Sequence, residues 1–358
     1  MKKLTILAVA LLAAASVSAK SWIRTNLIGY INTLPKVAVV IADTPTEVAT
    51  FDVCEARSGK VVFTGKAIEK DGSIWGMKSA YRLPFSELTK EGAYYIKIGD
   101  TRSENFRIGN DIYADAGNMP LYYMRQQRCG YNPYTGEECH QHDGYIVDHP
   151  TRTGEHIDVR GGWHDATDQL QYLMTSANAT FQMLFAYYKN PDQFTDKFDA
   201  AGNKGKNGVP DILDEARWGL EWLKRMNPDS AVMFNQIADD RDHAGIREPH
   251  TDKVDYGWGP GMGRPVYFIT GKVQGIGKYK NRNTGVASAA AKYASAFALG
   301  SVLFEKIDPE FAESMKKKAV DAMAFAEGDP GAFHGVCYKE PYFYEEANWI
   351  DDMELAAV

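Results

Sequence analysis

A change of hydrophobic period near Ile108 constrains the fold of this chain more than any other feature. Before that residue, short runs rich in Val, Ile, Phe and Tyr are separated by Pro, Gly, Asp and Ser. This spacing predicts β-strands in a small sandwich. After it, apolar residues recur at i, i+3, i+4 and i+7, which is the period of an amphipathic helix. We therefore expect a β-sandwich over residues 20–108 and an all-α domain over residues 109–358.

The helical part shows four stripes that can be bounded from the sequence. They predict helices over residues 170–188, 209–226, 285–304 and from Asp308 to about Glu327. The final segment, NWIDDMELAAV, begins a further apolar run without a Gly, a Pro or a capping residue to end it. We therefore expect the chain to be a fragment of a longer product.

The first nineteen residues have the pattern of a secretory signal peptide. Lys2 and Lys3 precede a short apolar run, and Val17-Ser18-Ala19 supplies small residues for a cleavage site. The run is too short to span a membrane, and we expect no other stretch to do so. Cleavage after Ala19 would give a secreted or periplasmic protein. The net charge of −7, without a Lys/Arg run, argues against a nucleic-acid partner.

The stretch GGWHDATDQLQYL carries two carboxylates, Asp165 and Asp168, where a helix is expected to start near Thr167. The positive end of a helix lowers the pKa of a nearby carboxyl group. An ionised carboxylate in a pocket can act as a general base on water, and a second one can orient that water. The alternative interpretation is structural, with Asp165 as the helix cap and Asp168 complementing the dipole.

The stretch CGYNPYTGEECHQH places Cys129, Cys139 and His140 in one loop. Two Cys and two His form a closed tetrahedral zinc site of the structural kind. A Cys129–Cys139 disulfide is the alternative in an exported protein. His164 is the best fourth zinc ligand, because a metal there would fix the loop that carries the adjacent Asp165.

A glycine-rich loop, DYGWGPGMGRPVYF, concentrates aromatic residues. Exposed aromatic faces stack on sugar rings, and binding residues collect on loops. Tyr256 and Trp258 are therefore candidate substrate-binding residues, as is Trp163 in the aspartate stretch. The alternative is that the loop folds its aromatic side chains into the core.

Several sequence blocks together resemble glycoside hydrolase family 9, in the subgroup with an immunoglobulin-like domain before the catalytic domain. In chain order the blocks are NLIGY (26–30), QRCG (127–130), GGWHDATD (161–168), NGVPDILDE (207–215) and NWIDDME (348–354). They extend over essentially the whole chain after the signal peptide.

The resemblance implies an (α/α)₆ barrel after the sandwich, incomplete in this chain. It also implies an endoglucanase-like enzyme that cleaves β-1,4-glucosidic bonds in cellulose or related β-glucans with inversion. Asp168 would be the general base, and Asp165 would help to hold the nucleophilic water. No organic cofactor is implied.

Two metals also follow from the resemblance. Residues Cys129, Cys139, His140 and His164 fall where this subgroup holds a structural zinc. Some relatives bind calcium, for which Asp352 is a candidate ligand by position.

The chain departs from the family pattern in two respects. Thr167 replaces the usual Gly of the DAGD motif, and a β-branched residue would narrow the cleft or alter a turn that needs free φ. Inversion also needs a general acid across the scissile bond. No Glu in the chain matches that motif, since Glu345 and Glu346 come too early. Two alternatives to an enzyme are a non-catalytic glycan-binding protein that lacks the acid, and an exported structural module.

Overall fold

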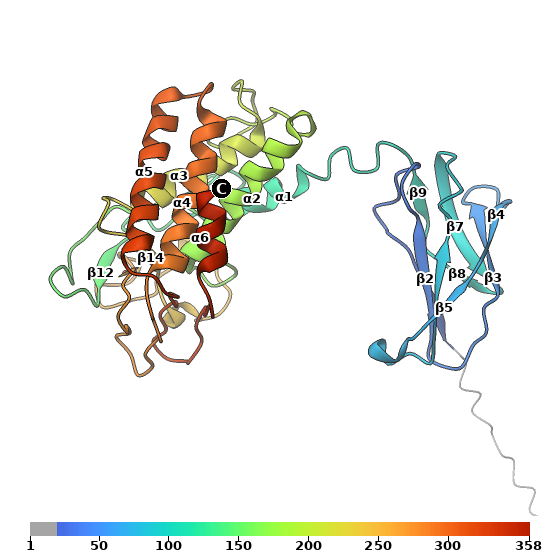
Figure 1. The fold of residues 1–358 in the computed structure, drawn as a ribbon, viewed down its shortest axis with the longest axis horizontal. Helices are drawn as coiled ribbons and strands as arrows, with labels where there is room; N and C mark the ends of the chain where they lie inside the picture. Colours follow the sequence, from blue (N-terminus) through green and yellow to red (C-terminus); the bar gives the residue numbers. More distant parts are fainter. Residues whose placement is uncertain (1–19) are drawn as a thin grey trace, which may run out of the picture. The chain divides into compact units, whose positions relative to one another are not determined.

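The computed structural model describes residues 20–358, which form two compact units, residues 20–114 and 115–358 (Figure 1). Because the predicted signal peptide, residues 1–19, lies outside the described residues, it stays a prediction. Each unit has a hydrophobic core of its own.

The first unit is a β-sandwich of two antiparallel sheets. One sheet has the order β1–β2–β6–β5, and the other has the order β4–β3–β7–β8 with β9 also paired to β7. The strands are β1 (Ser21–Arg24), β2 (Val37–Ala42), β3 (Thr50–Glu55), β4 (Val61–Lys66), β5 (Ile68–Lys70), β6 (Ser79–Pro84), β7 (Gly92–Ile98), β8 (Thr101–Arg102) and β9 (Phe106–Ile108). In β2 every second side chain is buried, which is the alternation of a strand with one face on the core.

Tyr30 anchors the NLIGY stretch to this core. Its ring packs edge-on against Phe85 and Phe106, with centroid distances of 5.0 and 5.3 Å. Its hydroxyl donates to the carbonyl of Val37 and accepts from the amide of Asn26. A tyrosine can occupy this buried position because its polar end is satisfied on both sides.

The second unit is built on packed helices. Within residues 115–358 these are α1 (Met119–Gln126), α2 (Leu173–Lys189), α3 (Asp211–Met226), α4 (Ala287–Phe304), α5 (Pro309–Gly328) and α6 (Ile350–Ala357). Helix α4 packs against α2, α5 and α6 (Figure 1). Helix α3 also contacts α4, and it does so closely at Gly300, where a Cβ atom would lie 2.8 Å from Leu220 of α3.

Helix α4 also meets the length and hydropathy of a membrane-spanning segment, contrary to the expectation that no other stretch would. However, 67% of it is buried inside the structure, as in the core helix of a helical domain. Burial on nearly all sides explains its uniformly apolar sequence.

The predicted all-α character of this unit was wrong in one detail. A four-stranded sheet of order β12–β15–β14–β13 lies among the helices. Its strands are β12 (Tyr145–Val147), β13 (Gln171–Tyr172), β14 (Phe234–Ile237) and β15 (Pro265–Phe268); a separate hairpin pairs β10 (Tyr131–Asn132) with β11 (Glu137–Glu138). Strands of two to four residues are too short to show a period of two, so the sequence pattern missed them.

The small sheet brings four distant loops together. The Cys/His loop leads into β12, the aspartate loop into β13, and the aromatic loop into β15. Strand β14 is followed by a 3₁₀ turn at Asp240–Asp242. The pairing is parallel between β12 and β15 and antiparallel elsewhere. The candidate site residues of the sequence therefore converge on one region.

Candidate active site and metal centre

The aspartate pair lies in a loop before β13 and not at a helix start. Helix α2 begins only at Leu173. Before it, the amide of Asp165 donates to the carbonyl of Leu170 at 2.8 Å, and this bond closes the residues between them into a loop. The predicted effect of a helix dipole on Asp168 was therefore wrong. Thr167, which departs from the family motif, is exposed and has no positive φ, so its β-branched side chain causes no backbone strain.

Asp165 has both carboxylate oxygens engaged by hydroxyl groups. Thr175 of α2 donates to Oδ1 at 2.8 Å, and Tyr344 donates to Oδ2 at 3.0 Å. Each oxygen keeps a second lone pair that can accept from water. Asp165 also lines a pocket with Tyr123, Gln127 and other residues between α1 and α2. Its carboxylate is thus held in one orientation and can be reached from solvent.

Asp168 is half-buried, with 21% of its side chain exposed. Its Oδ2 lies 3.0 Å from Nε2 of His243, whereas its Oδ1 is buried without a hydrogen-bond partner among the described residues. Burial raises the pKa of the Asp168 carboxyl group above its usual range, the positive charge of His243 lowers it, and the nearby Asp165 and Asp242 raise it. This carboxylate is more basic than an ordinary aspartate, and its Oδ1 keeps its lone pairs unused by the described residues.

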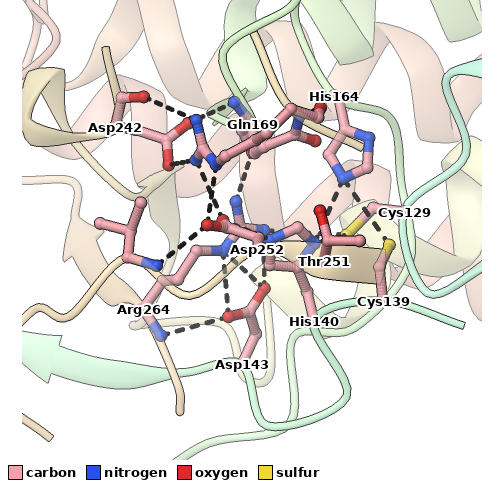
Figure 2. Close-up of polar contacts among 12 residues, drawn as sticks. Cys129, Cys139, His140, Asp143, His164, Gln169, Asp242, Thr251, Asp252 and Arg264 are labelled. Carbon is pink, nitrogen blue, oxygen red and sulfur yellow. Dashed lines mark hydrogen bonds and ion pairs between the residues drawn. The ribbon is translucent and has the colours of Figure 1, made fainter. Parts of the chain in front are cut away.

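The four predicted zinc ligands come together in one buried cluster (Figure 2). Nδ1 of His140 lies 3.4 Å from Nε2 of His164 and 3.6 Å from Sγ of Cys129. Sγ of Cys139 lies 3.9 Å from Nε2 of His164. A tetrahedral zinc with ordinary bond lengths spaces its ligand atoms about 3.3–3.8 Å apart. The donor set therefore fits a zinc ion in kind, number and spacing.

The alternative disulfide is not formed. All four cysteines of the chain are free thiols. Neighbouring Cys129 and the two histidines stabilise a thiolate at Cys139, whose pKa lies well below its usual range. The outer nitrogen of His140, Nε2, lies 3.1 Å from Oδ2 of Asp252. A carboxylate behind a ligating histidine is the usual support that fixes its tautomer.

The aromatic candidates separate into two kinds. Trp163 and Tyr256 are only 3% and 7% exposed, so the expectation that their faces stack on a sugar is not met. The indole of Trp163 donates to Glu215 at 2.8 Å, and the hydroxyl of Tyr256 donates to Asp242 at 3.0 Å. Trp258 is partly exposed and stacks on Tyr145 with centroids 4.5 Å apart. Only Trp258 keeps surface for a ligand.

A calcium ion does not fit at Asp352. Its Oδ2 lies 2.6 Å from Nζ of Lys292, which also contacts Oε1 of Glu346 at 2.6 Å. The Lys292 ammonium group of α4 already pairs with both carboxylates, and its positive charge opposes the binding of a divalent cation there.

Sequence reasoning missed three residues that contact the aspartates: Thr175, His243 and Tyr344. Thr175 is only ten residues from Asp165 in sequence, but the direction of its side chain depends on the residue at which α2 begins. The other two are separated from the pair by more than seventy residues. The acidic run DDRDH, which contains His243, was the available signal, because such a dense charge cluster in a chain of ordinary composition indicates a polar site.

A β-sandwich followed by a helical unit whose loops carry two carboxylates beside a Cys₂His₂ cluster defines the architecture of a helical-barrel glycoside hydrolase. The sequence comparison specifies the family. Residues 113–358 match the model of glycosyl hydrolase family 9, and residues 18–103 match the cellulase N-terminal Ig-like domain. The chain belongs to glycosyl hydrolase family 9.

Similar proteins agree with this assignment. Endoglucanase D of Acetivibrio thermocellus is 26% identical over 322 residues, which are 87% of this chain and 46% of that protein. A xyloglucan-specific endo-β-1,4-glucanase of Bacteroides ovatus is 27% identical over 347 residues, which are 92% of this chain and 54% of that protein. A metagenome-derived family 9 endoglucanase structure matches with a TM-score of 0.74 and 31% identity, over 94% of this chain and 60% of that chain.

The fold class follows from these matches. The chain consists of an immunoglobulin-like sandwich and part of an (α/α)₆ barrel. It spans about half the length of the curated relatives it matches.

Proposed function

We propose that the protein hydrolyses β-1,4-glucosidic bonds of cellulose or a related β-glucan with inversion, and that Asp168 is the general base. The observation that carries the proposal is the environment of Asp168: a half-buried carboxylate with a raised pKa, whose Oδ1 has no hydrogen-bond partner among the described residues. Such a group can take a proton from water as the water attacks the anomeric carbon. The names of the relatives support the β-glucan substrate.

Asp165 supplies the second contact to that water. Because Thr175 and Tyr344 fix its carboxylate, the remaining lone pairs have a defined direction. The general acid that protonates the leaving oxygen is proposed to lie in the part of the family domain that this chain does not span. Glu345 and Glu346 do not serve, since they pair with Arg282 and Lys292.

The replacement Asp168→Asn tests the base. Release of reducing ends from β-glucan by the full protein should fall by about 10²–10⁴-fold, because the amide cannot accept the proton. Asp158→Asn, which changes a surface carboxylate paired with Arg160, is the control and should keep full activity. Retained activity in Asp168→Asn would remove the assignment. Binding of β-glucan without any release of reducing ends would favour the non-catalytic glycan-binding alternative.

The Cys/His cluster is proposed to hold a structural zinc ion. Its closed set of four protein donors leaves no position for water, so it would act by fixing the loop of His164 and Asp165 and not by chemistry. About one zinc per chain should be found by elemental analysis, and Cys139→Ser should lose it. Cys337→Ser, at a buried thiol far from the cluster in sequence, should keep it.

Export is the third part of the proposal. The charged, apolar and small-residue segments of residues 1–19 support a signal peptide. The mature protein should therefore begin at Lys20, which mass spectrometry of the secreted or periplasmic product would establish.

A further inference from the structure

We propose that Arg247 and Arg264 are positioning residues that couple occupancy of the Cys/His site to the placement of the Asp168 carboxylate. The inference rests on the proposed function for the role of Asp168. It goes beyond the proposed function because it assigns the metal site a regulatory effect on the base, carried by two identified side chains.

The first arm starts at His140. With Nδ1 facing the metal site, Nε2 carries the ring proton and donates to Oδ2 of Asp252 at 3.1 Å. Arg247 grips the same carboxylate with Nε at 2.8 Å and Nη2 at 3.0 Å. Its Nη1 donates to the carbonyl of Asp242 at 3.1 Å, and its Nη2 to the carboxylate of Asp242. One guanidinium therefore bridges the carboxylate behind a metal ligand to a second buried carboxylate.

The second arm starts at Cys129. The fully buried Arg264 directs Nη2 toward Sγ of Cys129 at 3.7 Å. The same group is held by Asp143 at 2.7 Å and by Oε1 of Gln171 at 2.8 Å. Its other terminal nitrogen, Nη1, donates to the backbone carbonyl of Gln169. Figure 2 shows Arg264 beside Asp143, with dashed lines that join the two residues.

Both arms end on the peptide groups of one residue. The amide of Gln169 donates to Oδ2 of Asp242, which Arg247 holds, and the carbonyl of Gln169 accepts from Arg264. Gln169 directly follows Asp168. On the far side, His243 directly follows Asp242 and contacts Oδ2 of Asp168 at 3.0 Å. The carboxylate of Asp168 is thus positioned from its own backbone and from its histidine partner by the same network.

The physical consequence depends on burial. Asp242 and Gln169 are almost fully buried, where hydrogen bonds are strong and unpaired groups are costly, so the network has few alternative arrangements. A metal ion on Nδ1 fixes the tautomer of His140 and makes Nε2–H a stronger donor to Asp252. Without the metal, both histidine nitrogens and the two thiols can exchange partners, and the anchor of the first arm is loosened.

The test follows the imidazole nitrogens of His243 by nuclear magnetic resonance, since that ring reports directly on Asp168. Zinc is added to the metal-free chain, and the ¹⁵N shifts of His243, assigned with His243→Gln, are compared before and after. Wild-type protein should show a clear change. In Arg247→Met at saturating zinc, the change should fall to about half or less, as for a network that loses one of two arms. Arg264 is unsuitable for truncation because it is fully buried, whereas the side chain of Arg247 is 16% exposed.

Arg241→Met is the matched control. Arg241 lies in the 3₁₀ turn directly before Asp242, is 19% exposed and pairs with the buried Asp239. It has no hydrogen bond to Asp242, Asp252 or Gln169 among the described contacts. Its zinc response should equal that of the wild type. Arg247→Lys should give an intermediate response, because an ammonium group cannot grip two carboxylates in the bidentate manner of a guanidinium. In the full protein, Arg247→Met should lower kcat and leave KM nearly unchanged, as expected for a displaced base.

Two results would overturn the inference: an undiminished zinc response of His243 in Arg247→Met, or an equal loss in Arg247→Met and Arg241→Met. Either result would leave the proposed function intact if Asp168→Asn were inactive. Conversely, an active Asp168→Asn would remove the proposed function while the zinc response of His243 could still depend on Arg247. The two failures are therefore distinguishable.

Discussion

At the scale of single residues, burial and His243 act in opposite directions on the pKa of Asp168, and burial has the larger effect. Burial raises the pKa of Asp168, and the positive charge and hydrogen bond of His243 oppose that effect. A general base works only when deprotonated, so activity is lost as the pH falls through this pKa. The acid limb of kcat/KM should therefore lie above the value of about 3.9 of an unperturbed aspartate.

The replacement His243→Gln should move that acid limb to higher pH. The amide carries no positive charge, so the raising effects of burial, Asp165 and Asp242 act without opposition. The measurement is the pH dependence of kcat/KM for the full protein. His250→Gln, at an exposed histidine in the following segment, should leave the profile unchanged. A shift of the acid limb to lower pH in His243→Gln would contradict this account.

The sequence was sufficient to predict functional residues that lie close together along the chain. Cys129, Cys139 and His140 lie within twelve positions, and the structure brings them to His164 as the pattern predicted. Sequence reasoning did not find His243 or Tyr344, because their contacts with the aspartates join segments that are far apart in the sequence. It also misjudged Trp163 in the aspartate stretch and Tyr256 in the aromatic loop, since composition does not show which aromatic side chains face inward.

At the scale of elements, helical periodicity predicted α2, α3, α4 and α5 with errors at their ends, and it missed the short helix α1. Helices α3, α4 and α5 begin within two residues of the predicted positions. The larger error was at α2, where Leu170 extended the apolar stripe although it belongs to the aspartate loop. An apolar stripe shows which residues are buried but not whether their backbone is helical. A buried loop residue next to a helix is therefore assigned to the helix.

The contact between α4 and α6 gives a prediction about calcium. Because the Lys292 ammonium group pairs with both Glu346 and Asp352, adding calcium to the protein should not raise its melting temperature. Lys292→Met should be less stable by roughly 1–3 kcal/mol, since two partly buried carboxylates lose their counter-charge. Millimolar calcium should then restore part of that loss.

Thermal unfolding with and without calcium chloride measures both effects. Lys317→Met removes an exposed i,i+4 pair with Asp321 and is the matched control, with little change expected in either condition. A calcium-dependent rise in the melting temperature of the wild-type protein would show that the two carboxylates bind calcium despite Lys292.

At the scale of the whole molecule, the two units have separate cores and different sources of stability. The sandwich has a core of inward-facing strand residues, whereas the second unit has a helical core and also contains the Cys/His cluster, which is the proposed zinc site. Calorimetry should resolve two unfolding transitions, because units with separate cores melt as separate cooperative units. Chelation of zinc should lower one transition and leave the other unchanged. A single transition that shifts as a whole on chelation would contradict the independence of the two cores.

The Trp163 indole, which lies one residue before His164, also packs against a glycine that no site motif would select. A Cβ atom at Gly219 of α3 would lie 2.2 Å from Oγ1 of Thr180 and 2.4 Å from the Trp163 ring. Mutational scanning of the chain should therefore find that even alanine is poorly tolerated there. Gly219 should therefore be about as sensitive to substitution as the two aspartates, although it takes no part in the chemistry. Laboratory evolution of substrate preference should keep this glycine unchanged.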